Sequence, residues 1–490
     1  MAVYGRVRRS FRHGVEIPAV KREKVLLFNP RSDFYAMPLG LLAVGSALDP
    51  ERYDVRIFDA RIDSKAAQAV LDESQDAICV GMTVFSGPSI GGARRLSQAI
   101  KRRFPSLPVI WGGWHPSILP EQCIASGVVD AVVIAQGEPS FRELIASIDC
   151  REKWSEIGGL CVVVDGEPKR TAARALTRMD DLPAARYELL DMEMYFRRKG
   201  RRQVDYSSSR GCPYKCTFCA DPMVYRSKWT GIAPDRIVRE LIALDERYRI
   251  DEVFFLDDDL FANLKRIQML ADAFIAAKIQ FVWKGTARAD ELCRLPEEFF
   301  PKLRAAGCVK INVGAESGSQ RILDQIKKEY EVDEIINAAR RAAKVGIAVS
   351  NSFITGFPGE TEADFHATLE VIKTIRRLNP NIETSVFFYS PYPGTELVHH
   401  LEEKGLRLPD RLEDWENFDI EGAWLPRDNP RFVRRVQSLN FYLRHGYSAA
   451  TGSVPRKLLR GISRFRCERD WYGFPIEHYV AEALRGGLSS

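Results

Sequence analysis

The sequence predicts an α/β protein that contains two sheets of parallel strands and ends in a helical region. Its 490 residues are enough for about three domains, at roughly 150 residues each. Residues 24–150 alternate short β-rich runs with amphipathic stretches, which is typical of a doubly wound domain. Residues 203–389 contain six further β-rich runs separated largely by helix-length segments, as in a partial (β/α)6 barrel.

The composition excludes a disordered chain. Hydrophobic residues make up 45% of the sequence, charged residues 28%, and the mean hydropathy is −0.22, all close to the averages of globular proteins. The most apolar stretches, such as residues 39–48, are interrupted well before the roughly 18 residues that a membrane helix needs. We therefore expect no transmembrane span.

Residues 1–23 form a basic N-terminal arm. Its first part holds Arg6, Arg8, Arg9 and Arg12 with no acidic residue, and no apolar segment of a signal peptide follows. We therefore expect a cytoplasmic protein. The cysteines agree with this expectation, because thiols in a reducing compartment serve as metal ligands or catalytic groups more often than as disulfides.

Residues 24–150 form the first expected domain. Its strands are predicted at residues 24–28, 53–58, 77–82, 108–111 and 131–135. Ligands of such sheets bind beyond the carboxyl ends of the strands, where this sequence has turns rich in Gly, Pro, Ser or Thr. No G-x-G-x-x-G follows the first strand, so a nicotinamide domain is not expected.

Residues 151–200 are predicted to be a connector with a hairpin at Asp165–Gly166, and residues 201–400 to be the second domain. The strands of the second domain are predicted at residues 203–208, 252–256, 280–285, 309–313, 348–355 and 384–389. Residues 401–490, which include Trp415 and Trp424, form a helical C-terminal cap.

The cap carries most of the excess positive charge. Residues 431–470 contain ten Arg or Lys side chains against Glu468 and Asp470, while the whole chain has a net charge of +5. Such a block can be a solvated helical face, or it can contact an anionic membrane surface, an acidic substrate or nucleic acid. The charge alone does not choose among these.

Three of the ten cysteines are clustered. Cys212, Cys216 and Cys219 have the spacing C-x3-C-x2-C, in the loop after the first strand of the second domain. Soft thiolate ligands suit an iron–sulfur cluster. Structural zinc normally takes four ligands, and the motif has three. An iron–sulfur cluster held by three cysteines leaves one iron open for another molecule. The remaining alternative is that the three cysteines have this spacing by chance and hold nothing.

This motif, with the aromatic Phe218 before the last cysteine, resembles the signature of the radical S-adenosylmethionine (SAM) superfamily. The resemblance implies that Cys212, Cys216 and Cys219 hold a 4Fe-4S cluster whose open iron binds the amino and carboxylate groups of SAM. Electron transfer would cleave SAM to methionine and a 5′-deoxyadenosyl radical. The functional groups of such a barrel lie at the carboxyl ends of its strands.

The resemblance also assigns residues to SAM. The run Asp257, Asp258 and Asp259 stands where many members carry an acidic contact to the SAM amino group, and which Asp makes it stays open. The alternative is a cluster that caps a helix. Arg288 would pair with the SAM carboxylate or with a neighbouring Asp.

Two later strand ends complete this expected site. Glu316 resembles the polar residue near the SAM ribose, with helix capping as its alternative. Gly356 and Phe357 resemble the turn beside the adenine ring, where glycine permits close approach of the backbone, although a plain tight turn would look the same.

The turns of the first domain resemble the cobalamin-binding domain that precedes the barrel in the class B branch of this superfamily. The residues that we assign to cobalamin on this basis are Gly40, Thr83, Ser86, Gly112, Gly113, His115, Gly137 and Glu138. Each turn alone could be an ordinary βα loop. The loop at residues 29–40 lacks the D-x-H-x-x-G motif, so we expect cobalamin to bind without its lower base and without a histidine on cobalt, with His115 as a lining residue.

Together the resemblances imply a cobalamin-dependent radical SAM enzyme that methylates an unactivated carbon, or phosphorus, with a 5′-deoxyadenosyl radical and methylcobalamin. The alternatives are a radical cyclase or ring-rearranging oxidoreductase acting on a tetrapyrrole or another natural-product precursor, and a non-catalytic cobalamin-binding sensor. The expected partners are a small-molecule or lipid-like substrate and an electron donor such as a flavodoxin or ferredoxin. A peripheral membrane contact is a further expectation, and nucleic acid is not expected.

Overall fold

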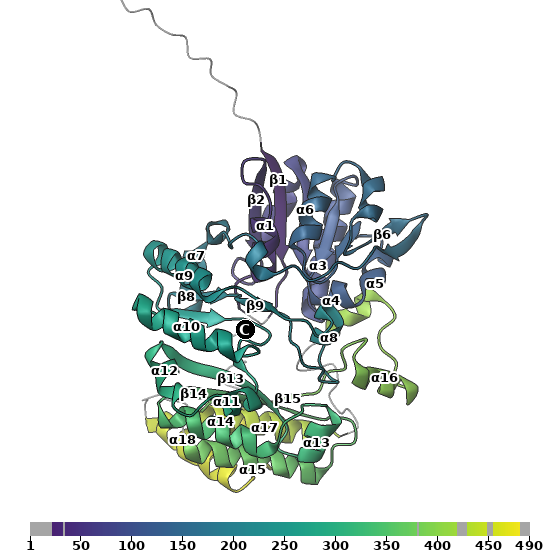
Figure 1. The fold of residues 1–490 in the computed structure, drawn as a ribbon. Helices are drawn as coiled ribbons and strands as arrows, with labels where there is room; N and C mark the ends of the chain where they lie inside the picture. The colour runs from purple at the N-terminus through teal and green to yellow at the C-terminus, as the bar shows by residue number, and fades with distance from the viewer. Residues whose placement is uncertain (1–21, 33–34, 380–381, 419–428, 448–453, 481–490) are drawn as a thin grey trace, which may run out of the picture.

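A computed structural model describes residues 22–32, 35–379, 382–418, 429–447 and 454–480. The first domain lies at the top of Figure 1, the second sheet lies below it, and two C-terminal helices lie at the bottom. Most of the expected basic arm, and Trp424 of the cap, fall outside the described residues. No helix in the described ranges combines the length and the apolar character that crossing a membrane requires.

The first sheet has the strand order β2-β1-β3-β4-β5-β6-β7. Its strands are β1 (Glu23–Asn29), β2 (Tyr53–Asp59), β3 (Ala77–Thr83), β4 (Val109–Gly112), β5 (Ala131–Val133), β6 (Leu160–Val164) and β7 (Glu167–Arg170). The first five in this order pair in parallel, as the doubly wound prediction requires. The interior strand β1 contains a continuous buried apolar run at Val25–Phe28, because helices cover both faces of such a sheet.

The hairpin expected in the connector is present, and it belongs to this sheet. Strands β6 and β7 pair antiparallel with each other, and β6 pairs antiparallel with β5. Asp165 and Gly166 both have positive φ, which is the geometry of the tight turns that match the twist of a hairpin. The sequence predicted the turn but gave no sign of the strand with which the hairpin pairs.

Helices follow the strands of the first domain at their carboxyl ends. They are α1 (Leu39–Ser46), α2 (Ala66–Glu73), α3 (Pro88–Arg103), α4 (Trp114–Ile118), α5 (Pro120–Ala125) and α6 (Glu138–Ala146). Because α1, α3, α4 and α6 begin near one edge of the sheet, the turns that precede them gather at a single site.

The second sheet has six parallel strands in the order β15-β14-β13-β12-β11-β8, which confirms the partial barrel. Its strands are β8 (Gln203–Tyr206), β11 (Glu252–Phe255), β12 (Val282–Ala287), β13 (Cys308–Glu316), β14 (Ala348–Thr355) and β15 (Thr384–Phe388). The expected first strand ends at Tyr206, two residues early, because the next residues turn toward Asp257. Ser209–Arg210 then forms the short strand β9, which pairs with β10 (Thr230–Gly231).

Helices cover the outer face of this sheet and connect its strands. Those before the third strand are α7 (Met192–Lys199), α8 (Asp221–Tyr225), α9 (Pro234–Tyr248) and α10 (Leu264–Ala277). Those that follow are α11 (Ala289–Arg294), α12 (Phe299–Ala305), α13 (Gln320–Gln325), α14 (Val332–Lys344) and α15 (Glu362–Leu378). Apolar side chains of these helices and of the strands form one large core.

The C-terminal region contacts both domains. It contains α16 (Glu396–Glu403), the 3-10 turn at Leu412–Asn417, α17 (Pro430–Gly446) and α18 (Val454–Glu468). Trp415 is fully buried in a core of the first domain. On the second domain, the Asn440 side chain exchanges two hydrogen bonds with the backbone of Val386 in β15, which covers the open edge of the sheet.

Candidate functional site: a cysteine loop below an interdomain cavity

Hydrogen bonds from backbone amides hold the cysteine loop in place. The Cys212 amide donates to Asp221 Oδ1 (3.0 Å), and the Thr217 amide donates to the Ile326 carbonyl (3.0 Å) at the end of α13. Gly211, just before the loop, has φ +76°, and a Cβ there would lie 2.1 Å from the Lys228 carbonyl oxygen. Only glycine fits this position, so the turn into the cysteine motif is fixed by sterics.

The three thiols suit a cluster of several irons. All three cysteines are half-buried, and burial raises the pKa of Cys219 to about 12 and also raises the pKa of Cys212. In the described part of the chain, no three His, Cys, Asp or Glu side chains are arranged to hold a single metal ion. Each sulfur of a 4Fe-4S site binds a different iron, so the three thiols of the expected cluster need not meet at a single ion. Coordination to iron also favours the thiolate over the thiol.

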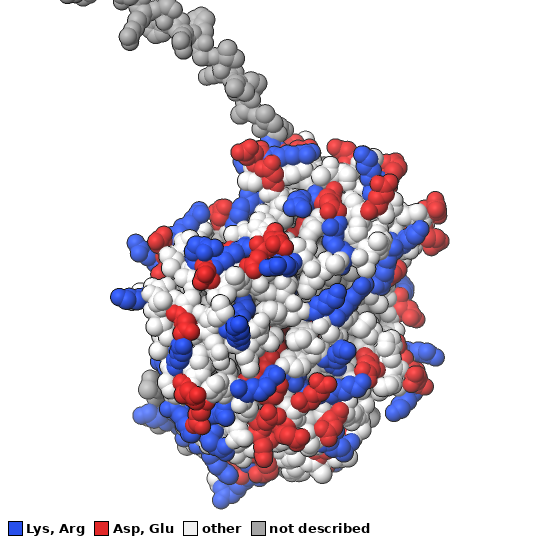
Figure 2. Space-filling view, in the orientation of Figure 1, with Lys and Arg blue, Asp and Glu red and all other residues white. Residues whose placement is uncertain are grey.

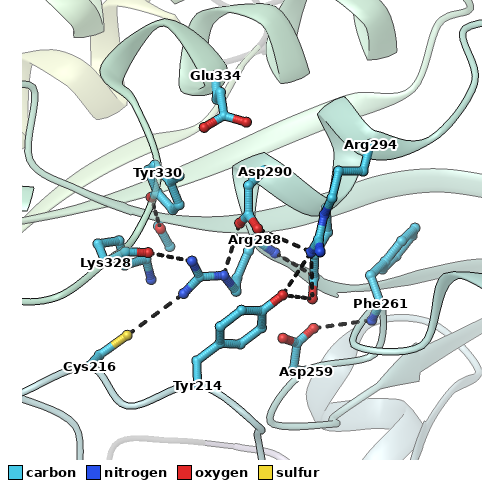
Figure 3. A network of polar contacts seen from close by, with 12 residues as sticks. Tyr214, Cys216, Asp259, Phe261, Arg288, Asp290, Arg294, Lys328, Tyr330 and Glu334 are labelled. Atoms are coloured by element: carbon cyan, nitrogen blue, oxygen red, sulfur yellow. Dashed lines mark hydrogen bonds and ion pairs between the residues drawn. The ribbon is translucent and has the colours of Figure 1, made fainter.

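Arg288 connects the cysteine loop to the strand ends around it (Figure 3). Its Nε donates to Asp290 Oδ1 (2.9 Å), Nη2 donates to the Lys328 carbonyl, and Nη1 lies 3.7 Å from Cys216 Sγ. The guanidinium also stacks over the Tyr214 ring at 3.6 Å. Of the two expected roles, the one seen is an ion pair with an Asp, and that Asp is Asp290.

The three consecutive aspartates have three different environments. Asp257 accepts from the Ser208 amide (2.7 Å) and from the Ser209 hydroxyl (2.7 Å), so it fixes the turn between β8 and β9. Asp258 accepts from the Gly211 amide (2.8 Å). Asp259 lies beside the cysteines, with Oδ2 3.9 Å from Cys212 Sγ. The following helix α10 is capped by another residue, Asn263, so these aspartates are not its capping cluster.

Asp259 lies near a second buried carboxyl group, that of Glu291. Burial, together with this neighbour, raises the pKa of Asp259 well above its usual range. Glu291 also accepts from the Tyr214 hydroxyl (3.0 Å) and from the Arg288 amide (3.0 Å). Glu291 lies within α11, and no motif in the sequence marks it as a site residue.

Glu316 and the turn at Gly356 lie at neighbouring strand ends. Glu316 accepts from Lys328 Nζ (2.8 Å), and both side chains are buried. Its φ of +59° is rare for a residue with a side chain and is found at functional sites. It does not cap α13, whose capping position is Ser319.

Phe357 joins this turn to the cysteine loop. Its ring packs edge-on against Phe218, with ring centres 5.7 Å apart, and lies 5.3 Å from the Tyr389 ring. Gly356 has φ +82°, and its amide donates to the Glu360 carboxylate. The strand-end residues assigned from the sequence therefore surround the cysteine loop.

A cavity lies between the carboxyl edge of the first sheet and the second domain. Six of the residues assigned to cobalamin line it: Gly40, Thr83, Gly112, Gly113, Gly137 and Glu138. The second domain contributes Ser207, Ser209, Arg210, Val224, Tyr225, Leu256 and Asp258. A Cβ on Gly40 would meet nothing closer than Thr83 Oγ1 at 3.9 Å, so a side chain there would extend into the cavity. The absence of side chains leaves room for a large ligand, as the expected cobalamin requires.

Ser86 and His115 are not among the lining residues of this cavity. The Ser86 hydroxyl and His115 Nδ1 are 3.0 Å apart and hydrogen-bond to each other. His115 is fully buried and packs edge-on against Trp415, with ring centres 5.4 Å apart. Burial lowers the pKa of His115 to about 4, so the ring is neutral at physiological pH.

Comparison with known proteins matches the cysteine loop and the cavity to two known protein families. Residues 206–372 match the model of the radical SAM superfamily, and residues 26–145 match the model of the B12 binding domain. A protein of Pyrococcus horikoshii, named an uncharacterized methyltransferase, is 30% identical over 455 residues, which cover 91% of this chain and 93% of that protein. The chain belongs to the cobalamin-binding radical SAM family.

Other proteins similar to this chain are named for other activities. An anaerobic magnesium-protoporphyrin IX monomethyl ester cyclase of Synechocystis is 23% identical and covers 79% of this chain and 78% of its own length. The solved structure of the cobalamin-dependent SAM radical enzyme OxsB, with aqua-cobalamin and SAM bound, superposes with a TM-score of 0.74 at 18% identity, over 92% of this chain and 72% of that chain. This last likeness is one of fold.

Proposed function

We propose that this protein is a cobalamin-dependent methyltransferase that uses radical SAM chemistry to methylate an unactivated carbon. One observation carries the proposal: Ser209 and Arg210 line the cavity of the cobalamin domain, and Cys212 follows two residues later. A methyl carrier and a radical generator would therefore bind on the two sides of one short segment. When bound, the cluster and SAM supply a radical that abstracts hydrogen, and cobalamin supplies the methyl group.

The residues around the cysteine loop would position SAM. Asp259, at 3.9 Å from Cys212 Sγ, is the aspartate that we assign to the SAM amino group. Arg288 contacts Cys216 through Nη1 and donates from Nε to Asp290. The Nε edge of its guanidinium is therefore already occupied by a protein carboxylate. Glu316, held by Lys328, is assigned to the ribose.

The adenine ring is assigned to the turn at Gly356 and Phe357, where the rings of Phe218 and Tyr389 provide an apolar wall that excludes water. Asp257 does not take part in this assignment, because its carboxylate already holds Ser208 and Ser209. Its role is to keep the segment that leads to Cys212 in place.

The cavity residues would hold cobalamin by shape. Gly40 lets a planar ligand approach the backbone closely, whereas at Gly113 a side chain would clash with Thr83 and Val84 of the protein itself. An external one-electron donor, such as a flavodoxin or ferredoxin, would reduce the cluster. The substrate is a small or lipid-like molecule that enters between the two domains.

The test is an anaerobic assay of the chain reconstituted with iron, sulfide and cobalamin. With SAM and a strong reductant, we expect both 5′-deoxyadenosine and S-adenosylhomocysteine. Cys216→Ala should bind less iron and lose deoxyadenosine, while Cys150→Ala, at a half-buried position in the first domain, should retain both products.

The products also distinguish the other reactions. Deoxyadenosine without S-adenosylhomocysteine would favour a radical cyclase, a candidate that the 23% identity to a cyclase of Synechocystis supports. A chain that retains cobalamin but yields neither product in the presence of a substrate extract would contradict both enzyme proposals and favour a sensor.

A further inference from the structure

Half of the large hydrophobic side chains that are exposed in the described residues lie close together near the end of the chain. They are Leu458, Phe465, Trp471, Phe474, Ile476, Tyr479 and Val480. Phe474 is 84% exposed and Leu458 is 65% exposed. We call residues 456–480 the C-terminal surface. A grouped set of exposed apolar side chains marks an interaction site, whereas single ones need no explanation.

The apolar side chains of α18 lie on its outer face. Leu458 and Phe465 are seven residues apart, and so they project from the same side of the helix. The opposite side, with Ser463, Arg466 and Cys467, is buried. The Phe465 ring lies 6.4 Å from the Trp471 ring, so the outer face of α18 continues into the loop that follows.

The loop after α18 is held from below by a buried arginine. Arg466 donates to the carbonyls of Trp471 (3.2 Å), Gly473 (3.1 Å) and Phe474 (3.1 Å). It also forms an ion pair with Glu477 at 3.0 Å. The exposed aromatic rings are therefore presented by a fixed backbone, and they are not the consequence of a frayed helix end.

Unpaired positive charge surrounds these rings. The acidic side chains of the C-terminal surface are already engaged: Glu468 with Arg377, Asp470 with Lys373, and Glu477 with Arg466. Figure 2 shows Lys and Arg side chains gathered at the lower left, where Figure 1 draws α18.

Three basic residues at the edges of the apolar face remain available. Arg456, Lys457 and Arg469 are exposed, and the structure gives them no carboxylate partner in the described ranges. Arg469 instead stacks over the Phe465 ring at 4.1 Å. Arg469 and Phe465 thus lie together, while Arg456 and Lys457 lie in the first turn of α18.

We propose that the C-terminal surface binds the surface of an anionic phospholipid bilayer. A helix with Lys and Arg beside Trp, Phe and Leu is the composition that lies in the membrane interface. Aromatic rings insert at the level of the headgroups, and the basic side chains meet the anionic phosphates. The proposal does not depend on the reaction that the enzyme catalyses.

Two other occupants fit the observations less well. A second copy of this chain, docked through the same face, would gather the basic side chains of both copies in one interface whose acidic side chains are already paired. An acidic protein would satisfy the charge, but an interface formed by charge alone would leave Phe474 and Leu458 in water.

The test is flotation of the full-length protein with vesicles of phosphatidylcholine alone or mixed with phosphatidylglycerol. Two variants probe the two components of the surface, R456E/K457E for charge and W471S/F474S for the apolar side chains. Their matched controls lie elsewhere: K65E/R102E makes the same change of charge at exposed positions in the first domain, and M269S removes an exposed apolar side chain from α10.

We expect the wild-type protein and both controls to float with the phosphatidylglycerol vesicles and not with phosphatidylcholine alone. Each surface variant should bind the anionic vesicles about tenfold more weakly, with a circular dichroism spectrum and a cobalamin content like those of the wild type. Added salt should weaken the binding of the wild type to the anionic vesicles, because it screens the attraction between the basic side chains and the lipid phosphates.

Three results would overturn the proposal. The folded wild type could stay unbound with anionic vesicles, or R456E/K457E could bind them as tightly as K65E/R102E. Light scattering could also show a dimer of the wild type that W471S/F474S converts to a monomer, which would make this face a contact between two copies.

Discussion

Arg210 and Glu138 form an ion pair, with Nη1 2.7 Å from Oε1, that joins the two domains at the cavity. Arg210 belongs to β9, two residues ahead of Cys212, and Glu138 is the first residue of α6 in the cobalamin domain. Both side chains line the cavity. The position of the cobalamin domain is therefore linked directly to the segment that leads into the three clustered cysteines.

Replacing Glu138 by Gln should loosen this link. The change leaves the buried Arg210 without its counter-charge, and breaking one partner of a buried pair costs about 3 kcal/mol. We expect a lower midpoint of thermal unfolding and a lower cobalamin content. The matched control is Glu143→Gln, on the same helix, which removes a half-exposed ion pair with Arg174 and should cost under about 1 kcal/mol. Equal effects of the two changes would refute the special role of the Arg210 pair.

Two neighbouring aspartates should respond differently to the same substitution. Asp257→Asn keeps one oxygen for the Ser208 amide but places an NH2 group where the Ser208 and Ser209 hydroxyls donate, so the free energy of unfolding should fall by about 2 kcal/mol. Asp259→Asn should weaken SAM binding about tenfold, because the ammonium group of SAM would favour the ionised form of Asp259 and the amide of Asn cannot supply that charge. Denaturant unfolding and equilibrium binding of SAM to the reconstituted protein separate the two effects. If Asp259→Asn bound SAM as tightly as the wild type, the assignment of Asp259 would fail.

His115 should make the fold less stable in acid. Its pKa is lowered from 6.5 to about 4 by burial, so below pH 6.5 the unfolded chain takes up a proton that the folded chain does not. The free energy of unfolding should then fall by about 1.4 kcal/mol per pH unit from this group, until the pH approaches the folded pKa. The slope of stability against pH between 6.5 and 5 should be smaller in His115→Gln. The difference between the two slopes is the contribution of this one group.

Bound cobalamin should have no histidine on cobalt. The loop at residues 29–40 has no histidine, and no histidine is among the residues that line the cavity. His115 is turned toward Ser86 and Trp415. An electron paramagnetic resonance spectrum of the cob(II)alamin form should therefore lack nitrogen superhyperfine splitting. Splitting that disappears in His115→Gln would show that the ring reaches cobalt.

Local patterns in the sequence predicted most of the fold. The strands of both sheets and the turn at Asp165–Gly166 were found because apolar periodicity and turn residues are encoded over a few positions. Pairings between distant segments left no such pattern. The hairpin β6–β7 completes the first sheet, and Trp415 enters a core whose other members are mostly far away in sequence. Both depend on burial that appears only when the chain is folded.

The site was predictable to a similar extent. The cysteines and the strand-end residues follow from a motif and from the rule that ligands gather at the carboxyl ends of strands. Their partners do not: Glu291 beside Asp259, Lys328 beside Glu316, and Asp290 beside Arg288 lie in helices and loops with no motif of their own. Ser86 and His115 come from the expected turns, but they pair with each other away from the cavity lining.

The most direct test of the central claim follows the methyl group of SAM. The protein, reconstituted with iron, sulfide and cobalamin, is incubated without oxygen with reductant and SAM that carries a deuterium-labelled methyl group, and the corrinoid fraction is then analysed by mass spectrometry. The account predicts that label moves into the corrinoid fraction together with an equal amount of S-adenosylhomocysteine. Deoxyadenosine formation with all of the label remaining in SAM and methionine would contradict a methyltransferase.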